Sequence, residues 1–189
     1  MTMNSAVLDA CVLFSGSLRD FFLRLAEDEL IYPFWSETIQ NEWFRSLLKK
    51  RPGLKPEKLE RTRQQMDIHF PRSLVRGYED IIPNLLLPDE EDKHVLAVAI
   101  YVKAKYIVTF NLKDFPASAL APYQVTAISP DDFTLRIIKY AAKTFITTVA
   151  KHRSDLINPP KTVEQYLDTL AQQKLHKTVA FLREHKDKI

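Results

Sequence analysis

Hydrophobic and polar positions along the chain form blocks that predict strands and helices in turn. Four short apolar runs predict buried strands, at residues 5–8 (SAVL), 30–34 (LIYPF), 105–110 (KYIVTF) and 124–128 (QVTAI). The segments between them have helical spacing, as in residues 36–50, where Ile39, Trp43 and Leu47 share one face. Strands that alternate with helices predict an α/β fold with a parallel sheet covered on both faces.

Polar residues and prolines predict where the helices begin and end. Ser17 and Asp20 have the spacing of an amino-terminal cap for the helix that follows the first strand, and Ser36 predicts the cap of the next helix. Pro52 and Pro56 then separate that helix from a strongly charged one.

The pattern changes after about residue 130. A long helical segment is followed by a linker-like break, SDLINPP, and by a helix that Thr162 and Gln165 cap. We therefore predict an α/β domain over residues 1–130 and a C-terminal helical extension over residues 131–189.

Composition excludes several classes of protein. Only three glycines are present, which argues against a glycine-rich phosphate-binding loop. No apolar run approaches the roughly 18 residues of a membrane span, and the amino end lacks the basic segment of a signal peptide. We expect a cytoplasmic protein that does not enter a membrane. The single cysteine, Cys11, is either a nucleophile or, as we favour, a small core residue.

Charge is unevenly distributed although the net charge is only +3. Residues 79–92 contain six acidic and no basic residues, whereas residues 45–76 contain ten basic residues and three acidic ones. An acidic centre with basic flanks suits metal ions together with a polyanion. The alternative interpretation is two solvated helical faces.

Polar residues also follow the predicted strands at one edge of the sheet. Asp9 ends the first strand, Asn111 and Asp114 follow residues 105–110, and Asp92 begins the helix before that strand. Glu42, within the helix over residues 36–50, is tolerated only if it faces a polar cleft or solvent.

Each carboxylate has a structural explanation of its own. Asp9 and Asp92 would cap helices, and Glu42 would pair with Arg45 or Ser46. Together they favour a Mg²⁺ or Mn²⁺ site, because converging carboxylates repel one another unless a cation neutralises them.

The blocks LDACVL, NEW and PDEEDKHVLAVAI, the last followed by IVTFNLKDF, resemble the metal-binding blocks of PIN-domain ribonucleases, in particular VapC-type toxins and their longer relatives. The resemblance covers residues 5–130 and implies a three-layer α/β/α fold. It assigns metal binding to Asp9, Glu42 and Asp92. Asp92 is chosen because Ala97 and Ala99 follow it at the family's spacing. The other acids of the run, Asp89 to Glu91, are expected to be solvated.

The fourth position of the family's site is open between two residues. Many members have an acid where this chain has Asn111, and Asp114 follows three residues later. Asn111 would then bind a metal-bound water and Asp114 would be the fourth acid. Thr109 would contact metal-bound water or phosphate, or be structural. His94 is either a metal ligand or, as we favour, a surface residue or a support behind the ligands.

The resemblance implies a Mg²⁺- or Mn²⁺-dependent endoribonuclease, the toxin of a type II toxin–antitoxin pair. Asp9, Glu42, Asp92 and Asp114 would be both metal-binding and catalytic. RNA would be the substrate, an antitoxin protein a partner, and the chain a homodimer. We expect Asn111, Thr109 and the basic residues Lys49, Lys50 and Arg51 to contact RNA.

Two alternatives come from other classes of protein. A haloacid-dehalogenase-like phosphatase needs an acid two residues after its nucleophilic aspartate, where this chain has Cys11. The other alternative is a module that binds nucleic acid or an antitoxin without catalysis. The extension would either guide RNA through its lysines or, as we favour, pack through its apolar positions.

Overall fold

The computed structural model describes residues 4–189, which divide into two compact units. The first unit contains the chain up to Phe14 together with Tyr32–Ile128, and the second contains Ser15–Ile31 and Ser129–Ile189. Residues 15–31 were predicted to belong to the α/β domain, whereas in the structure this segment packs within the second unit. The functional division near residue 130 stays a prediction.

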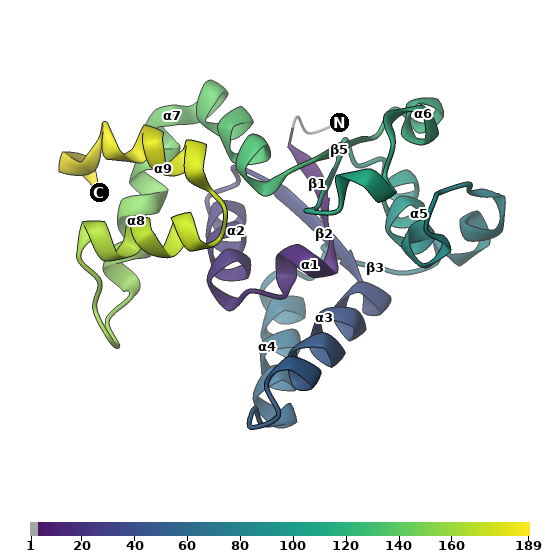
Figure 1. Cartoon of the computed structure of the whole chain (residues 1–189), viewed down its shortest axis with the longest axis horizontal. Coiled ribbons are helices and arrows are strands. Elements are labelled where there is room, and N and C mark those ends of the chain that lie inside the picture. The colour runs from purple at the N-terminus through teal and green to yellow at the C-terminus, as the bar shows by residue number, and fades with distance from the viewer. Residues whose placement is uncertain (1–3) are drawn as a thin grey trace. The chain divides into compact units, whose positions relative to one another are not determined.

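The first unit is built on a parallel sheet of five strands in the order β3-β2-β1-β4-β5. Figure 1 labels four of them, β1, β2, β3 and β5. The strands are β1 Ser5–Leu8, β2 Tyr32–Ser36, β3 Leu74–Val75, β4 Tyr106–Val108 and β5 Thr126–Ile128. All four strand pairs are parallel, so the predicted α/β fold is confirmed. β3 was not predicted, because a strand of two residues is too short to show a period.

Helices cover this sheet between the strands. The helices of the first unit are α1 Ala10–Leu13, α3 Glu37–Lys50, α4 Pro56–His69, α5 Lys93–Tyr101 and α6 Ala117–Leu120, with the short 3₁₀ helices η1 Glu79–Asn84, η2 Glu90–Asp92, η3 Leu112–Asp114 and η4 Ala121–Tyr123. The chain runs outward from β1 to β3 and then returns to β4 on the other side of β1. Because right-handed crossovers change face when the direction reverses, α3 and α5 cover opposite faces.

The core of the first unit follows the predicted pattern. All four residues of β1 are buried, as expected for a central parallel strand. Ile39, Trp43 and Leu47 form the buried face of α3, and the Ser36 hydroxyl accepts a hydrogen bond from the Ile39 N–H at 3.2 Å. The predicted cap and apolar face of this helix are both confirmed.

The second unit consists of helices. They are α2 Gly16–Glu27, α7 Pro130–Asp155, α8 Val163–Gln172 and α9 His176–Arg183, followed by the 3₁₀ helix η5 Lys186–Lys188. The predicted cap at Ser17 is wrong, because the helix begins earlier and Ser15 caps it by accepting the Leu18 N–H. The predicted cap of α8 is confirmed as a capping box. No helix within residues 4–189 is long and apolar enough to cross a membrane.

A buried histidine joins three helices of the second unit. His152 of α7 is 4% exposed, and its Nε2 lies 2.8 Å from the Asp20 carboxylate of α2. Its Nδ1 lies 2.9 Å from the Tyr166 hydroxyl of α8. Since a carboxylate only accepts, Nε2 donates its proton to Asp20, and Nδ1 shares a second hydrogen bond with the Tyr166 hydroxyl. The hydrogen bond from His152 holds the pKa of Asp20 below its ordinary value.

The Tyr166 hydroxyl gives a testable contribution to stability. Tyr166→Phe leaves the buried Nδ1 of His152 without its partner, so we expect the free energy of unfolding to fall by about 1–3 kcal/mol. Tyr140→Phe is the matched control, because Tyr140 is 53% exposed on α7. Urea unfolding followed by circular dichroism compares the two variants. A Tyr166→Phe variant as stable as the control would contradict the contribution of this hydrogen bond.

Candidate metal centre

A pocket of about 510 Å³ opens at the carboxyl edge of the sheet in the first unit. Its lining residues come from the segment after β1, from α3, from the segment before α5 and from the segment after β4: Asp9, Ala10, Cys11, Phe14, Glu42, Trp43, Ser46, Lys50, Asp89, Glu91, Asp92, Asn111 and Asp114. The adjacent strands β1 and β4 are where the strand order reverses. Ligands of open parallel sheets bind at such a switch point.

Asp9 is fixed by the strand next to its own. Its N–H donates to the Val108 carbonyl at 3.1 Å, which continues the pairing of β1 with β4. Its carboxylate makes no capping bond to α1; instead, Oδ2 accepts from the Thr109 hydroxyl at 2.6 Å. Thr109 Oγ1 in turn accepts the Asn111 N–H at 2.9 Å. Thr109 is completely buried and does not line the pocket, so its visible role is to hold Asp9.

Cys11 is a second donor to Asp9. Its Sγ lies 3.1 Å from Asp9 Oδ2 and accepts the Phe110 N–H at 3.3 Å. Burial and, after it, the neighbouring Asp9 charge raise the pKa of Cys11 to about 12. A thiol with this pKa stays protonated near neutral pH, which argues against a nucleophile. Cys11 is partly buried and forms a neutral part of the pocket wall.

The acidic run divides between the pocket and the solvent. Asp89 begins η2 by accepting the Glu91 N–H at 2.9 Å, and Asp92 precedes α5 without capping it. Asp89, Glu91 and Asp92 line the pocket, whereas Glu90 is outside the lining and pairs with Lys93 at 2.7 Å. Asp89 and Glu91 were predicted to be solvated, and their place in the pocket lining was not predicted. The three-residue spacing from Asp89 to Asp92 was the available signal, because a 3₁₀ turn aligns such residues.

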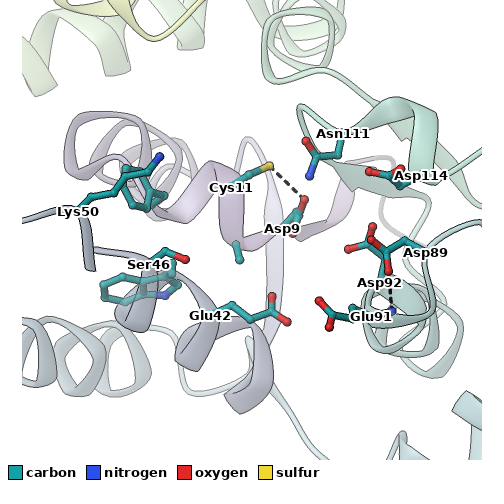
Figure 2. A pocket seen from close by; sticks show the side chains of 13 residues that line it. Asp9, Cys11, Glu42, Ser46, Lys50, Asp89, Glu91, Asp92, Asn111 and Asp114 are labelled. Carbon is teal, nitrogen blue, oxygen red and sulfur yellow. Dashed lines mark hydrogen bonds between the residues drawn. The ribbon is translucent and has the colours of Figure 1, made fainter. Parts of the chain in front are cut away.

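The pKa of Asp92 reflects both its partial burial and the carboxylates around it. Partial burial, followed by the charges of Asp9, Asp89 and Asp114, raises the pKa of Asp92 from 3.8 to about 6. Figure 2 shows the side chains of Asp89, Asp92 and Asp114 on one side of the pocket, facing Asp9 and Glu42. A cation bound among them would relieve this repulsion.

One face of α3 supplies the opposite wall. Glu42, Ser46 and Lys50 are spaced four residues apart, so they form a single stripe along the helix, and all three line the pocket. The Lys50 ammonium lies 4.9 Å from the centre of the Phe14 ring. Of the three basic residues predicted to contact RNA, Lys50 alone lines this pocket, while Lys49 and Arg51 are exposed outside its lining.

The structure places both candidates for the fourth position in the pocket. Asn111 and Asp114 each line it, at the start and the end of η3, and Asp114 is the less exposed of the two. Figure 2 shows both side chains above those of Asp89 and Asp92. The choice between them stays a prediction.

The donor set suits a hydrated cation. Among residues 4–189, no three His, Cys, Asp or Glu side chains come close enough to hold one ion directly. Mg²⁺ is commonly held by one or two carboxylates and keeps several of its waters, so direct contact with every acid is unnecessary. Hard oxygen donors around an open pocket therefore fit Mg²⁺ or Mn²⁺ better than a soft metal.

The raised pKa of Asp92 predicts how the metal-free protein responds to pH. Stability that depends on protonated Asp92 is complete below pH 3.8 and is lost as the pH rises through about 6. Asp92→Asn has no such charge, so we expect the variant to melt at a higher temperature than the wild type at pH 7.5 in EDTA. The difference should disappear toward pH 4.

Thermal melts across this pH range, with Glu90→Gln as the control, measure the effect. Glu90 belongs to the same acidic run but lies outside the pocket lining. A variant Asp92→Asn that melts below the wild type at pH 7.5 would show that the carboxylate is not under repulsion.

Comparisons with known proteins agree with this geometry. Residues 5–113 match the model of the PIN domain, and residues 130–184 match that of the VapC50 C-terminal domain. A protein of Mycobacterium tuberculosis (strain ATCC 25618 / H37Rv) named "Putative ribonuclease VapC50" is 39% identical over 97 residues. The match covers 51% of this chain and 57% of that protein, and no solved structure matches the chain significantly.

The first of these matches settles the family. The PIN-domain match spans more than half of the chain and contains Asp9, Glu42 and Asp92. It excludes the haloacid-dehalogenase alternative, and the second match agrees with the resemblance to the longer VapC-type proteins. The chain belongs to the PIN-domain family and has a C-terminal segment of the VapC50 type.

Proposed function

We propose that this protein is a metal-dependent endoribonuclease that hydrolyses phosphodiester bonds of RNA. The observation that carries the proposal is the pocket at the switch point of the sheet, lined by six carboxylates and Asn111. The family of the chain and the ribonuclease named in its relative support the same activity. The match covers little more than half of that relative, so the substrate is part of the proposal.

Asp9, Glu42 and Asp92 would hold the divalent ion, with Asp114 as the fourth acid. When bound, Mg²⁺ or Mn²⁺ supplies a Lewis acid and an activated water for in-line attack on the phosphate. Thr109 and Cys11 hold the Asp9 carboxylate, so Asp9 would not have to rearrange to take up an ion. Asn111 would orient a water or a phosphate oxygen through its amide, and Thr109 would act through Asp9.

Lys50 would receive the RNA backbone. It stands eight residues after Glu42 on the same stripe of α3, about 12 Å along the helix axis. A phosphate on the Lys50 ammonium is therefore separated from the acidic centre that would repel it. Lys49, Arg51 and the other basic residues up to Arg76 would attract RNA from a longer distance.

The C-terminal match extends the proposal to a biological role. A VapC50-type segment, together with the name of the relative, favours the toxin of a type II toxin–antitoxin pair, with an antitoxin protein as its partner. A homodimer and a cytoplasmic location stay predictions. The alternative, a PIN-like module that binds RNA or an antitoxin without catalysis, is decided by the first experiment below.

Removal of a single carboxylate tests catalysis. We expect Asp9→Asn and Asp92→Asn each to lower RNA cleavage by more than about 100-fold, because loss of an ion ligand exceeds the loss caused by outer partners. Glu90→Gln, outside the pocket lining, should cleave as the wild type does. Cleavage of a labelled RNA in EDTA, Mg²⁺ and Mn²⁺ measures this. A wild type that binds RNA but does not cleave it in EDTA, Mg²⁺ or Mn²⁺ would favour the non-catalytic alternative.

The salt dependence of RNA binding tests the basic residues. Replacing Lys49, Lys50 and Arg51 with Gln should flatten the slope of log affinity against log salt by up to about two units, because each lost phosphate contact removes about 0.7. The matched control replaces three exposed lysines of α7, Lys139, Lys143 and Lys151, with Gln. Filter binding in EDTA measures both slopes. A flattening in the control alone would transfer the RNA path to the C-terminal extension.

A further inference from the structure

Behind Glu42 in the first unit stands a buried histidine that the proposed chemistry does not use. His94 lies in the first turn of α5, and its side chain is 9% exposed. Its Nε2 is 2.8 Å from Oε1 of Glu42, which belongs to α3. His94 does not line the pocket, whereas Glu42 does. The imidazole therefore contacts the carboxylate from the side of the protein interior.

The contact defines the proton position on His94. A carboxylate only accepts, so a favourable contact at this distance requires the proton on Nε2. The contact between Nε2 and Oε1 is close, but it does not meet hydrogen-bond geometry. Nδ1 is also buried without a hydrogen bond. Among the described residues, Glu42 is the one acid whose carboxylate lies within 4.0 Å of this imidazole.

Glu42 needs such a partner more than Asp9 does. Its side chain is 40% exposed and has three rotatable bonds, whereas Asp9 is 4% exposed and held by two donors. Glu42 does not pair with Arg45 or Ser46, the neighbours that the sequence suggested. Without His94, the carboxylate would have to lose its rotamer freedom at the moment an ion binds.

We propose that His94 is a positioning residue that holds Oε1 of Glu42, so that Oε2 is directed at a divalent cation in the pocket. The inference rests on the proposed metal centre. On this proposal, the start of α5 supplies both a metal-binding acid, Asp92, and the residue that positions Glu42, His94 in the first turn. Partners behind metal-binding carboxylates fix the orientation of the ligand, and their loss commonly costs 10- to 100-fold in affinity.

Two amides of different reach test the proposal. The amide nitrogen of Gln reaches the position of His Nε2, whereas that of Asn reaches only the position of Nδ1. We therefore expect His94→Asn to weaken Mn²⁺ binding by about tenfold or more and His94→Gln to keep most of the wild-type affinity. Mn²⁺ binding to the full chain without RNA, by isothermal titration calorimetry, measures this. Equal affinities for the two variants would overturn the proposal.

A double substitution separates positioning from packing. If His94 acts through Glu42, then Glu42→Gln with His94→Asn should bind Mn²⁺ no more weakly than Glu42→Gln alone. Losses that simply add would overturn the proposal. Val95→Ala is the control for packing, because Val95 is completely buried on the same helix. It should lower the melting temperature and leave Mn²⁺ affinity unchanged.

Failure of this inference is distinguishable from failure of the proposed metal centre. If the wild type binds Mn²⁺ and Asp92→Asn does not, the centre exists, and the His94 variants then test positioning alone. If Asp92→Asn binds Mn²⁺ as tightly as the wild type, the ion is bound elsewhere and both proposals fail. Melting curves show that each variant is folded before its affinity is measured.

Discussion

Repulsion among carboxylates at one edge of the sheet is the constraint on which the site depends. Parallel strands bring the residues that follow β1 and β4 to the same edge, and the reversal of strand order leaves a space there. Burial and, after it, the charges of the neighbouring acids raise the pKa of Asp92. The protein offsets part of the repulsion with its own donors, since Thr109 and Cys11 both donate to Asp9.

The acids of the pocket differ in how firmly they are held. Asp9 is buried and fixed by backbone and side-chain bonds, while Asp89 uses its carboxylate to begin η2. Glu42 and Asp92 make no bond that caps a helix. In this site Asp9 is held firmly, while Glu42 and Asp92 are less constrained. Such a site suits an ion that keeps water and shares its coordination with a substrate phosphate. The stripe from Glu42 to Lys50 adds a cation at the far end of the same wall.

In the second unit, polar groups buried between helices are paired by hydrogen bonds. His152 satisfies Asp20 and Tyr166 together, and Thr148 donates to Asp28 at 2.6 Å. The last α-helix, α9, begins after Leu175, which has no side-chain acceptor, and Asp131 of α7 accepts the N–H groups of Lys177 and Thr178 in its first turn instead. These directional bonds join α2, α8 and α9 to α7 more specifically than apolar contact does.

Much of the fold and the position of the site could be predicted from the sequence, because they depend on local chemistry. The parallel sheet followed from apolar runs separated by helical periods, and Ser36, Thr162 and Gln165 were predicted as caps because capping depends on residues within one turn. The edge that carries Asp9 and Asp92 also followed, since strand direction in such a fold determines where loops meet. Charge composition alone indicated an acidic centre with basic flanks.

Contacts between distant segments were decided only by the tertiary structure. Residues 15–31 pack in the second unit because the partners of Asp20 and Asp28 lie on α7, more than a hundred positions later in the chain. The contact of Glu42 with His94 likewise joins two helices that no local period relates. A sequence shows which side chains share a turn or an edge, so it determined the kinds of residue that form the site. The distances between elements depend on how the whole core packs, and the structure alone determined which of those residues touch.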